Sequence, residues 1–323
     1  MERETLLVVG RPSERLLAKL EASVAPMGMV VGESPEAFAG AAPAATVILG
    51  WSTSGELLRQ VLAIAPRVRW VHDVWAGMDH LPLDALRGSR AVLTNARGVF
   101  SQALGEWVLA AILYFAKDFR KLVKDQTEGR WVPYHPAAVA GQTVGILGYG
   151  DIGRAVAGQA RALGMRVLGM TRTGPLPKQT DNLAEQIFAP ADSIRMIEQC
   201  DYLVIAAPLT PETRGMVGEA EIAAMKPDAV LINIGRGPIV SEGALVRALS
   251  AGKIKGAALD VFDTEPLPAG HPFFALENVL VSPHSADRAA GWLDRAVQLF
   301  LDNLERYRRG QPLANVVDKA RGY

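Results

Sequence analysis

The sequence has almost no cysteine, no excess of charge of either sign and no long apolar run. Its single cysteine, Cys200, cannot form an internal disulfide, which fits a reducing compartment, and its flanks predict a structural position ahead of a strand. Lys and Arg (34) balance Asp and Glu (34), so no basic field attracts nucleic acid or an anionic membrane. No apolar stretch reaches the ~18 residues of a membrane span. The start of the chain, Met1–Thr5, lacks the pattern of a secretory signal. We therefore expect a cytoplasmic protein with a small-molecule partner and no metal.

The length of 323 residues, 49% of them apolar, allows about two domains with separate cores. In roughly the first 95 residues, short apolar runs alternate with amphipathic segments. The runs expected to be strands are Leu6–Gly10, Thr46–Gly50, Val68–His72 and Ala91–Thr94, and the expected helices are Glu14–Leu20 and Gly55–Leu62. This alternation predicts an α/β domain on a parallel sheet, without a glycine fingerprint of its own.

A glycine-rich turn follows the apolar run Thr143–Leu147. Gly148, Gly150 and Gly153 have G-x-G-x-x-G spacing, and a predicted helix follows them as far as Gly164. Gly148 allows the tight turn, Gly150 lets the backbone approach a phosphate, and Gly153 lets the helix pack against the strand. Because the helix N-terminus presents N–H groups and a partial positive charge, the turn predicts a dinucleotide site.

Five further strands are expected after this turn, with helices between most of them. They are Arg166–Met170, Tyr202–Ala206, Ala229–Asn233, Gly256–Asp260 and Val279–Ser282. A helix from Ala289 to about Arg309 has no strand left to pair with nearby, so we expect it to return to the first domain. The sequence thus predicts a doubly wound cofactor domain, residues 97–288, inserted into a domain of residues 1–96 and 289–323. The apolar helix Gly105–Ala116 is expected to be buried on more than one side.

Three polar residues follow predicted strands of the second domain: Arg236, Glu265 and His284. The carboxyl ends of parallel strands meet at one edge, so these side chains should converge beside a bound nicotinamide. A histidine can protonate the oxygen of a ketone under reduction, and a carboxylate beside it fixes its tautomer. A guanidinium can hold a substrate carboxylate with two hydrogen bonds. Together they predict an acid, its orienting partner and a substrate anchor.

With these motifs the chain resembles the D-isomer-specific 2-hydroxyacid dehydrogenases, over nearly its whole length. The resemblance is carried by Val144–Gly153, Pro208–Thr213, Asn233–Gly237, Leu259–Phe262 with Glu265–Pro266, and Ser282–His284. It implies a Rossmann cofactor domain inserted into a flavodoxin-like substrate domain, and a homodimer through the cofactor domain. It also implies that Arg236, Glu265 and His284 are the catalytic residues.

The resemblance further implies which residues bind the ligands. The cofactor would contact Gly148, Tyr149, Gly150, Asp151, Ile152, Gly153, Thr171, Arg172, Thr173, Ala207, Pro208, Thr213, Ile234, Gly235, Arg236, Asp260, His284 and Ala286. Asp260 would bind the nicotinamide amide. The substrate would contact Trp75, Ala76, Gly77, Arg236 and His284, with its carboxylate on the backbone N–H groups of Ala76 and Gly77.

Three departures from the family pattern affect specific expectations. Thr171–Arg172–Thr173 stands where NAD-preferring members carry an acidic residue, which predicts a preference for NADP(H) over NAD(H). Trp75 replaces a small residue and would either face the substrate or pack inward. Asp287 would approach the nicotinamide or, as we prefer, cap the following helix.

The expected activity is reduction of a small 2-oxo acid, glyoxylate or hydroxypyruvate first, to a D-2-hydroxy acid. A short phosphoglycerate dehydrogenase is the alternative among enzymes. A dinucleotide-sensing corepressor is an alternative of another class, because such proteins can keep the same three residues. The sequence does not identify the substrate side chain.

Overall fold

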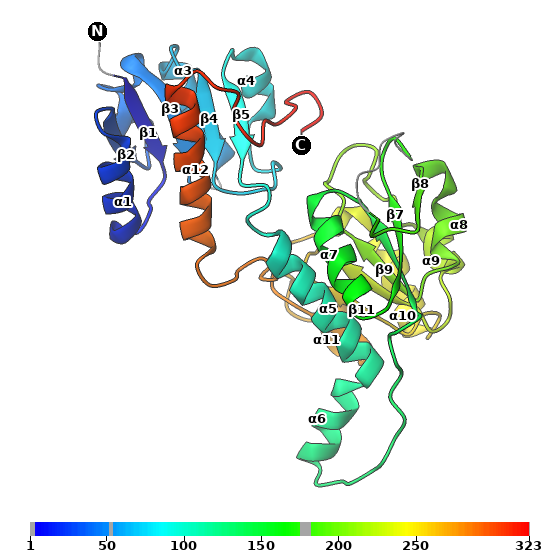
Figure 1. The fold of residues 1–323 in the computed structure, drawn as a ribbon. Helices are drawn as coiled ribbons and strands as arrows, with labels where there is room; N and C mark the ends of the chain where they lie inside the picture. The colour runs from blue at the N-terminus through cyan, green and yellow to red at the C-terminus, as the bar shows by residue number, and fades with distance from the viewer. Residues whose placement is uncertain (1–3, 52–53, 175–181, 323) are drawn as a thin grey trace. The chain divides into compact units, whose positions relative to one another are not determined.

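The computed structural model describes residues 4–51, 54–174 and 182–322, which form two compact units (Figure 1). The first unit comprises Met1–Phe100 and Ala290–Tyr323, and the second comprises Ser101–Ala289. Each unit is an α/β fold on its own parallel sheet, so the predicted fold class is confirmed. None of the described helices is long and apolar enough to span a bilayer.

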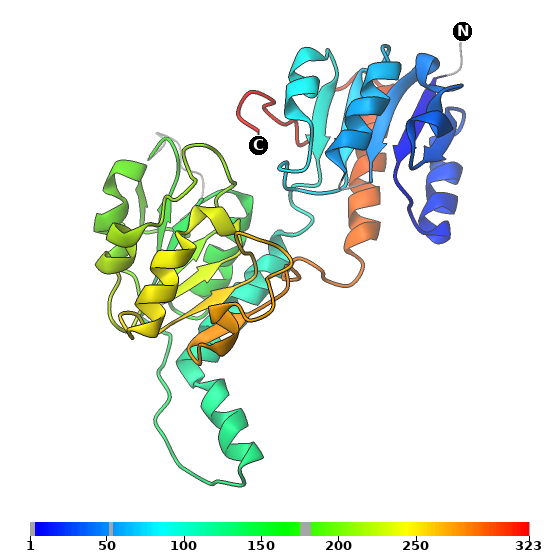
Figure 2. The ribbon, with the colours of Figure 1, turned by 180° about the vertical axis from the view of Figure 1, so that it is seen from behind.

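The first unit has a five-stranded sheet in the order β2-β1-β3-β4-β5, the doubly wound order of flavodoxin-like folds. Its strands are β1 (Thr5–Val9), β2 (Gly28–Gly32), β3 (Ala45–Gly50), β4 (Trp70–Asp73) and β5 (Val92–Asn95). Its helices are α1 (Glu14–Val24), α2 (Pro35–Phe38), α3 (Gly55–Ile64), α4 (Leu83–Gly88) and α12 (Trp292–Arg308), with a 3₁₀ turn η1 (Ala42–Ala44). Figure 1 shows α1 and α12 on one face, and Figure 2 shows the other helices on the opposite face. Because both faces are covered, every residue of the central strand β3 is buried.

The second unit has a seven-stranded parallel sheet in the order β12-β11-β10-β9-β6-β7-β8. Its strands are β6 (Thr143–Leu147), β7 (Arg166–Met170), β8 (Gln186–Phe188), β9 (Tyr202–Ile205), β10 (Val230–Asn233), β11 (Gly256–Leu259) and β12 (Val279–Val281). Its helices are α5 (Ser101–Lys117), α6 (Phe119–Thr127), α7 (Asp151–Ala162), α8 (Ser193–Ile197), α9 (Glu219–Ala224), α10 (Glu242–Ser250) and α11 (Pro272–Ala275), with 3₁₀ turns η2 (Pro190–Asp192) and η3 (Gly237–Ile239). The strand order reverses between β6 and β9, where doubly wound sheets bind their ligands.

Two edge strands and one helix boundary differ from the sequence expectations. The strands β2 and β8 were not predicted; β2 has glycine at both ends, and β8 has only three residues. The last helix begins at Trp292, because the chain first passes through Gly291 with a positive φ of 75°. Asp287 is therefore four residues ahead of the helix cap, and the prediction that it caps this helix is wrong.

Cys200 has the structural position that its flanks predicted. Its thiol is buried, donates to the carbonyl of Met196 at 3.1 Å, and fills the space beside Gly145. Burial raises the pKa of Cys200 to about 12, so the thiol stays protonated and unreactive.

Candidate active site

Three neighbouring strands of the second unit deliver the predicted catalytic residues to one edge of the sheet. β10, β11 and β12 lie side by side and run parallel. Arg236 follows β10, Glu265 follows β11, and His284 follows β12. Because the strands are parallel, their carboxyl ends open on the same side, as the sequence predicted.

His284 and Glu265 are in direct contact. His284 Nδ1 lies 2.7 Å from Glu265 Oε2, and both side chains remain about one third exposed. The other carboxylate oxygen, Oε1, accepts from the backbone N–H of Phe262 at 2.9 Å. An ionised carboxylate only accepts hydrogen bonds, so Nδ1 carries the proton of this contact. Nε2, the other ring nitrogen, takes no part in the contact with Glu265. This pairing is suited to proton transfer through Nε2.

A buried carboxylate fixes the loop that carries the histidine. Asp260 is 2% exposed, and its Oδ1 accepts from the Ser282 hydroxyl at 2.6 Å and from the backbone N–H groups of Ser285 (2.9 Å) and Ala286 (3.1 Å). The backbone N–H of His284 also donates to the Asp260 carbonyl at 2.9 Å. These bonds support His284 in a left-handed conformation, φ 49°, that a non-glycine residue seldom adopts. The nicotinamide contact predicted for Asp260 stays a prediction; its loop contacts were not foreseen.

Arg236 is held between two glycines because other backbone segments approach closely on both sides. A Cβ at Gly235 would lie 2.8 Å from the carbonyl oxygen of Ala207, and one at Gly237 would lie 2.0 Å from a backbone carbon of Phe262. The Arg236 guanidinium donates to the carbonyl of Gly235 at 2.7 Å. Two of the loops at this edge thus pack directly on the arginine turn.

The glycine turn has the geometry that the fingerprint predicts. Gly148 has φ 96°, and a Cβ there would lie 2.5 Å from the backbone N of Ala207. A Cβ at Gly153 would lie 2.5 Å from the Gly148 carbonyl oxygen, so only glycine allows α7 to pack this closely. Among the described residues, no atom lies within 4 Å of a Cβ at Gly150, the N-cap of α7. Open space at a helix N-terminus suits a pyrophosphate, so the turn fits a dinucleotide.

Other predicted cofactor residues lie after β6, in the first turn of α7 and in the loops after β7, β9 and β10. Tyr149 is 4% exposed, and its ring packs on Gly169 rather than facing solvent. The Thr171 hydroxyl donates to the Gly174 carbonyl at 2.8 Å, and Thr213 donates to the Pro208 carbonyl at 2.7 Å. The remaining members are Asp151 and Ile152 in the first turn of α7, exposed Arg172 and Thr173 after β7, Ala207 after β9, and Ile234 after β10.

Arg172 lies within electrostatic range of an acidic residue. A hydrogen bond with Thr210 lowers the pKa of Glu212, and the positive charge of Arg172 lowers it further. Glu212 belongs to the Pro208–Thr213 segment after β9, so this acid faces the turn after β7.

The predicted substrate loop lies in the first unit, after β4. The carbonyl of Ala76 accepts from Asn95 Nδ2 at 2.8 Å, and that of Trp75 accepts from the N–H of Ala96 at 3.0 Å. The Trp75 ring packs at a tilt against Trp292, with centroids 4.7 Å apart, and lies near-parallel to Phe100 at 6.4 Å. Trp75 therefore packs within an aromatic cluster, one of the two orientations left open; its contact with substrate stays a prediction.

Comparison with known proteins gives consistent matches. A family model described as "D-isomer specific 2-hydroxyacid dehydrogenase, NAD binding domain" matches residues 109–286. The glyoxylate reductase of Aeropyrum pernix is 35% identical over 272 residues, covering 80% of this chain and 79% of the relative. That of Thermococcus gammatolerans is 34% identical over 269 residues, with the same coverage.

Solved structures match over almost the full length. A D-isomer specific 2-hydroxyacid dehydrogenase from Xanthobacter autotrophicus, in complex with NADPH and MES, is 30% identical with a TM-score of 0.80 and covers 99% of each chain. An NADPH-dependent glyoxylate/hydroxypyruvate reductase from Sinorhizobium meliloti, in complex with NADP and sulfate, is 26% identical with a TM-score of 0.85 and covers 100% of each chain.

Proposed function

Because the chain belongs to the D-isomer-specific 2-hydroxyacid dehydrogenase family, we propose that it reduces glyoxylate and hydroxypyruvate with NADPH. The class of reaction, NAD(P)H-dependent reduction of a 2-oxo acid to a D-2-hydroxy acid, follows from the family. The substrate choice is supported by the names of the relatives, glyoxylate reductases and a glyoxylate/hydroxypyruvate reductase. The observation that carries the proposal is the 2.7 Å contact between His284 and Glu265.

The proposed roles follow from the charges that the reaction moves. When bound, the nicotinamide supplies the hydride to the carbonyl carbon. Negative charge then develops on the carbonyl oxygen, and His284 Nε2 donates a proton to it. Glu265 accepts from Nδ1–H, which fixes the orientation of the ring, and its charge stabilises the imidazolium form that carries a second proton on Nε2. Arg236 binds the substrate carboxylate, with help from the N–H groups of Ala76 and Gly77, and polarises the carbonyl.

A preference for NADPH is the next part of the proposal, and it rests on Arg172. Thr171, directly after β7, has no carboxylate that would repel a 2′-phosphate, and Arg172 beside it supplies positive charge. Replacing Arg172 by alanine is expected to raise the KM for NADPH about tenfold, the effect of losing one charge-assisted hydrogen bond, with little change for NADH.

Steady-state kinetics measure both the cofactor preference and the substrate choice. The panel is glyoxylate, hydroxypyruvate and 3-phosphohydroxypyruvate, each with NADPH and with NADH. Arg195→Ala is the matched control, because Arg195 is an exposed residue of α8 paired with Asp192. A wild-type efficiency with NADH ten times that with NADPH would contradict the preference. Fastest turnover of the phosphorylated acid would favour a phosphoglycerate dehydrogenase, and cofactor binding without turnover would favour a sensor.

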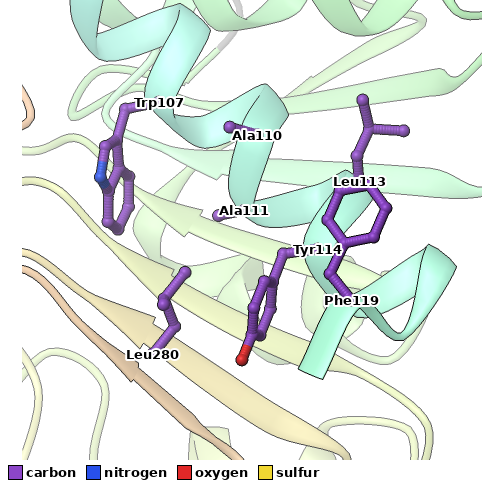
Figure 3. A pocket seen from close by; sticks show the side chains of 7 residues that line it. All are labelled: Trp107, Ala110, Ala111, Leu113, Tyr114, Phe119 and Leu280. Carbon is purple, nitrogen blue, oxygen red and sulfur yellow. The ribbon is translucent and has the colours of Figure 1, made fainter. Parts of the chain in front are cut away.

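The proposal includes a homodimer formed through the second unit, supported by two apolar surfaces. A groove of about 350 Å³ runs along α5, lined by Trp107, Ala110, Ala111, Leu113, Tyr114, Phe119 and Leu280 (Figure 3). Leu280 belongs to the edge strand β12. The groove thus combines a partly exposed helix face with one edge of the sheet.

The second surface is an arm, residues 119–132, that extends away from the rest of the second unit (Figures 1 and 2). Of the ten exposed large apolar side chains in the described residues, five lie on this arm: Phe119, Leu122, Val123, Trp131 and Val132. Trp131 is 95% exposed, and the Arg130–Asp125 ion pair, 2.7 Å, orders the turn before it. One chain carries both surfaces, so two copies related by a twofold axis can cover both.

Replacing Trp131 by glutamate is expected to convert a dimer of twice 34.6 kDa into a monomer. The buried apolar ring would be lost and a charge would enter a dry interface, which costs several kcal/mol. Light scattering after size exclusion measures the mass. Ile194→Glu, at an exposed apolar position of α8, should leave it unchanged. A monomeric wild-type chain, or a dimeric Trp131→Glu variant, would remove the arm from the proposal.

A cytoplasmic location completes the proposal. Its support is the single cysteine, Cys200, which is buried as a free thiol and so fits a reducing compartment.

A further inference from the structure

A close pair of side chains, Asp73 and His80, lies at the base of the predicted substrate loop, outside the roles proposed so far. Asp73 is the last residue of β4, which lies between β3 and β5, and its side chain is 1% exposed. His80 Nε2 lies 2.9 Å from Asp73 Oδ2, with 20% of the histidine side chain exposed. The two residues bracket the segment Val74–Asp79, so the pair joins the two ends of the loop.

Burying such a pair costs the fold free energy. A carboxyl group without solvent contact needs a polar partner, and removing one member leaves the other buried and unpaired. Burial raises the pKa of Asp73, opposed by His80 and by the backbone N–H groups of Trp75 and Val74. Gly50, at the end of β3, makes room for this carboxylate, because a Cβ there would lie 3.3 Å from Asp73 Oδ1.

The middle of the loop reaches the surface while its flanks are buried. Val74 is 0% and Met78 is 4% exposed, whereas Trp75, Ala76 and Gly77 between them are partly exposed. The N–H of Val74 donates to the Gly50 carbonyl at 3.1 Å. Within the described part of the chain, no group accepts from the N–H of Ala76 or of Gly77. Two successive backbone donors at the surface of a turn form a site for an anion such as a carboxylate.

We infer that Asp73 and His80 are positioning residues, which hold both ends of the loop so that the N–H groups of Ala76 and Gly77 meet the substrate carboxylate. The inference rests on the proposed function.

The Asp73–His80 pair is predicted to affect binding of the substrate carboxylate only. Replacing His80 by leucine should raise the KM for glyoxylate about tenfold or more, since each charge-assisted hydrogen bond to the carboxylate depends on loop geometry. The KM for NADPH should stay within about twofold, because the glycine turn lies in the other unit. The kcat/KM for methyl pyruvate, an ester without a carboxylate charge, should also stay within about twofold.

Two further variants keep the test independent of folding. His80→Gln retains an N–H donor of similar reach, and combined with Asp73→Asn it gives a neutral pair that can hydrogen-bond. The KM of the double variant for glyoxylate should therefore lie between that of wild type and that of His80→Leu. Its change in KM should be smaller than the sum of the changes in His80→Gln and Asp73→Asn. Asp84→Asn is the matched control, because it breaks an exposed ion pair, Arg59–Asp84, in the same unit.

The outcomes separate this inference from the proposed function. A wild-type chain that reduces no 2-oxo acid with either cofactor would overturn both. An active wild type whose KM for glyoxylate is unchanged in His80→Leu and His80→Gln would overturn the inference alone. Equal losses on glyoxylate and on methyl pyruvate would mean that the pair only supports the fold, which also overturns it.

Discussion

Replacing His284 by alanine is expected to lower kcat by about 100-fold or more, the usual contribution of a positioned general acid. The variant keeps the glycine turn and the Asp260 contacts made by Ser282 and Ser285, so it should still bind NADPH, although one predicted contact, that of His284 itself, is lost. Without the imidazole, only water remains to protonate the developing alkoxide. Steady-state kinetics give kcat, and quenching of tryptophan fluorescence gives cofactor binding.

Two further variants test the assignment to His284. Glu265→Gln should lower kcat less than His284→Ala does and shift the pH profile, because the 2.7 Å partner of Nδ1 loses its charge. His135→Ala, at an exposed histidine outside the site, should leave kcat unchanged. An activity of His284→Ala within a few-fold of wild type would remove this residue from proton transfer.

The second prediction concerns His72, whose burial should lower the free energy of unfolding in acid. This side chain is 0% exposed, and burial lowers its pKa to about 3. Thr94 Oγ1 accepts from Trp70 Nε1 at 2.8 Å and is also the partner of His72 Nδ1 at 2.7 Å. Among the described residues no partner reaches Nε2, and the Phe300 ring packs beside the imidazole. The fold thus accepts only the neutral ring.

The free energy of unfolding falls as the pH falls because the unfolded chain binds more protons than the folded one. An unfolded histidine takes up a proton below a pKa of about 6.5, and the folded one does not until a pKa of about 3. The free energy of unfolding should therefore fall by roughly 1.4 kcal/mol per pH unit between these values, several kcal/mol in all. Stability from this group is present above pH 6.5 and is lost as the pH falls.

Urea unfolding of the full chain at pH 7, 6 and 5, for wild type and His72→Gln, isolates the effect. Asp73 titrates in the opposite sense, since burial raises its pKa, and it is common to both proteins. The stability advantage of wild type over the variant should shrink with each step to lower pH. A constant difference across the series would show that His72 takes up no proton on unfolding.

Features with a strict local cause were predictable from the sequence. At Gly148 and Gly153 a Cβ would lie 2.5 Å from a backbone atom, so only glycine fits there. Such positions can be recognised in the sequence by the spacing of the glycines. Arg236, Glu265 and His284 were placed by strand ends alone, because parallel strands bring their carboxyl ends together. The contact between His284 and Glu265 is consistent with this topology and needed no knowledge of packing.

Features that depend on distant partners were not predictable. Trp75 packs on Trp292, a residue more than 200 positions later, so its orientation was decided by a helix that the sequence only approximately located. The Asp73–His80 pair spans a loop whose shape no motif describes. One signal was present, however: Asp73 is an acidic residue directly after an apolar strand. Asp287 was misjudged because the turn at Gly291 delays the helix.

The proposed division of labour between the two units has a consequence for how such a protein diversifies. The glycine turn, the arginine turn and the His284–Glu265 pair all belong to the continuous segment Ser101–Ala289. In the proposed mechanism, the residues for redox and proton-transfer chemistry are therefore encoded in one uninterrupted segment. Substitutions in the loop after β4 can retune which acid is accepted without touching that segment. New substrate preferences can then evolve, or be engineered, by grafting short surface loops onto an unchanged reaction centre.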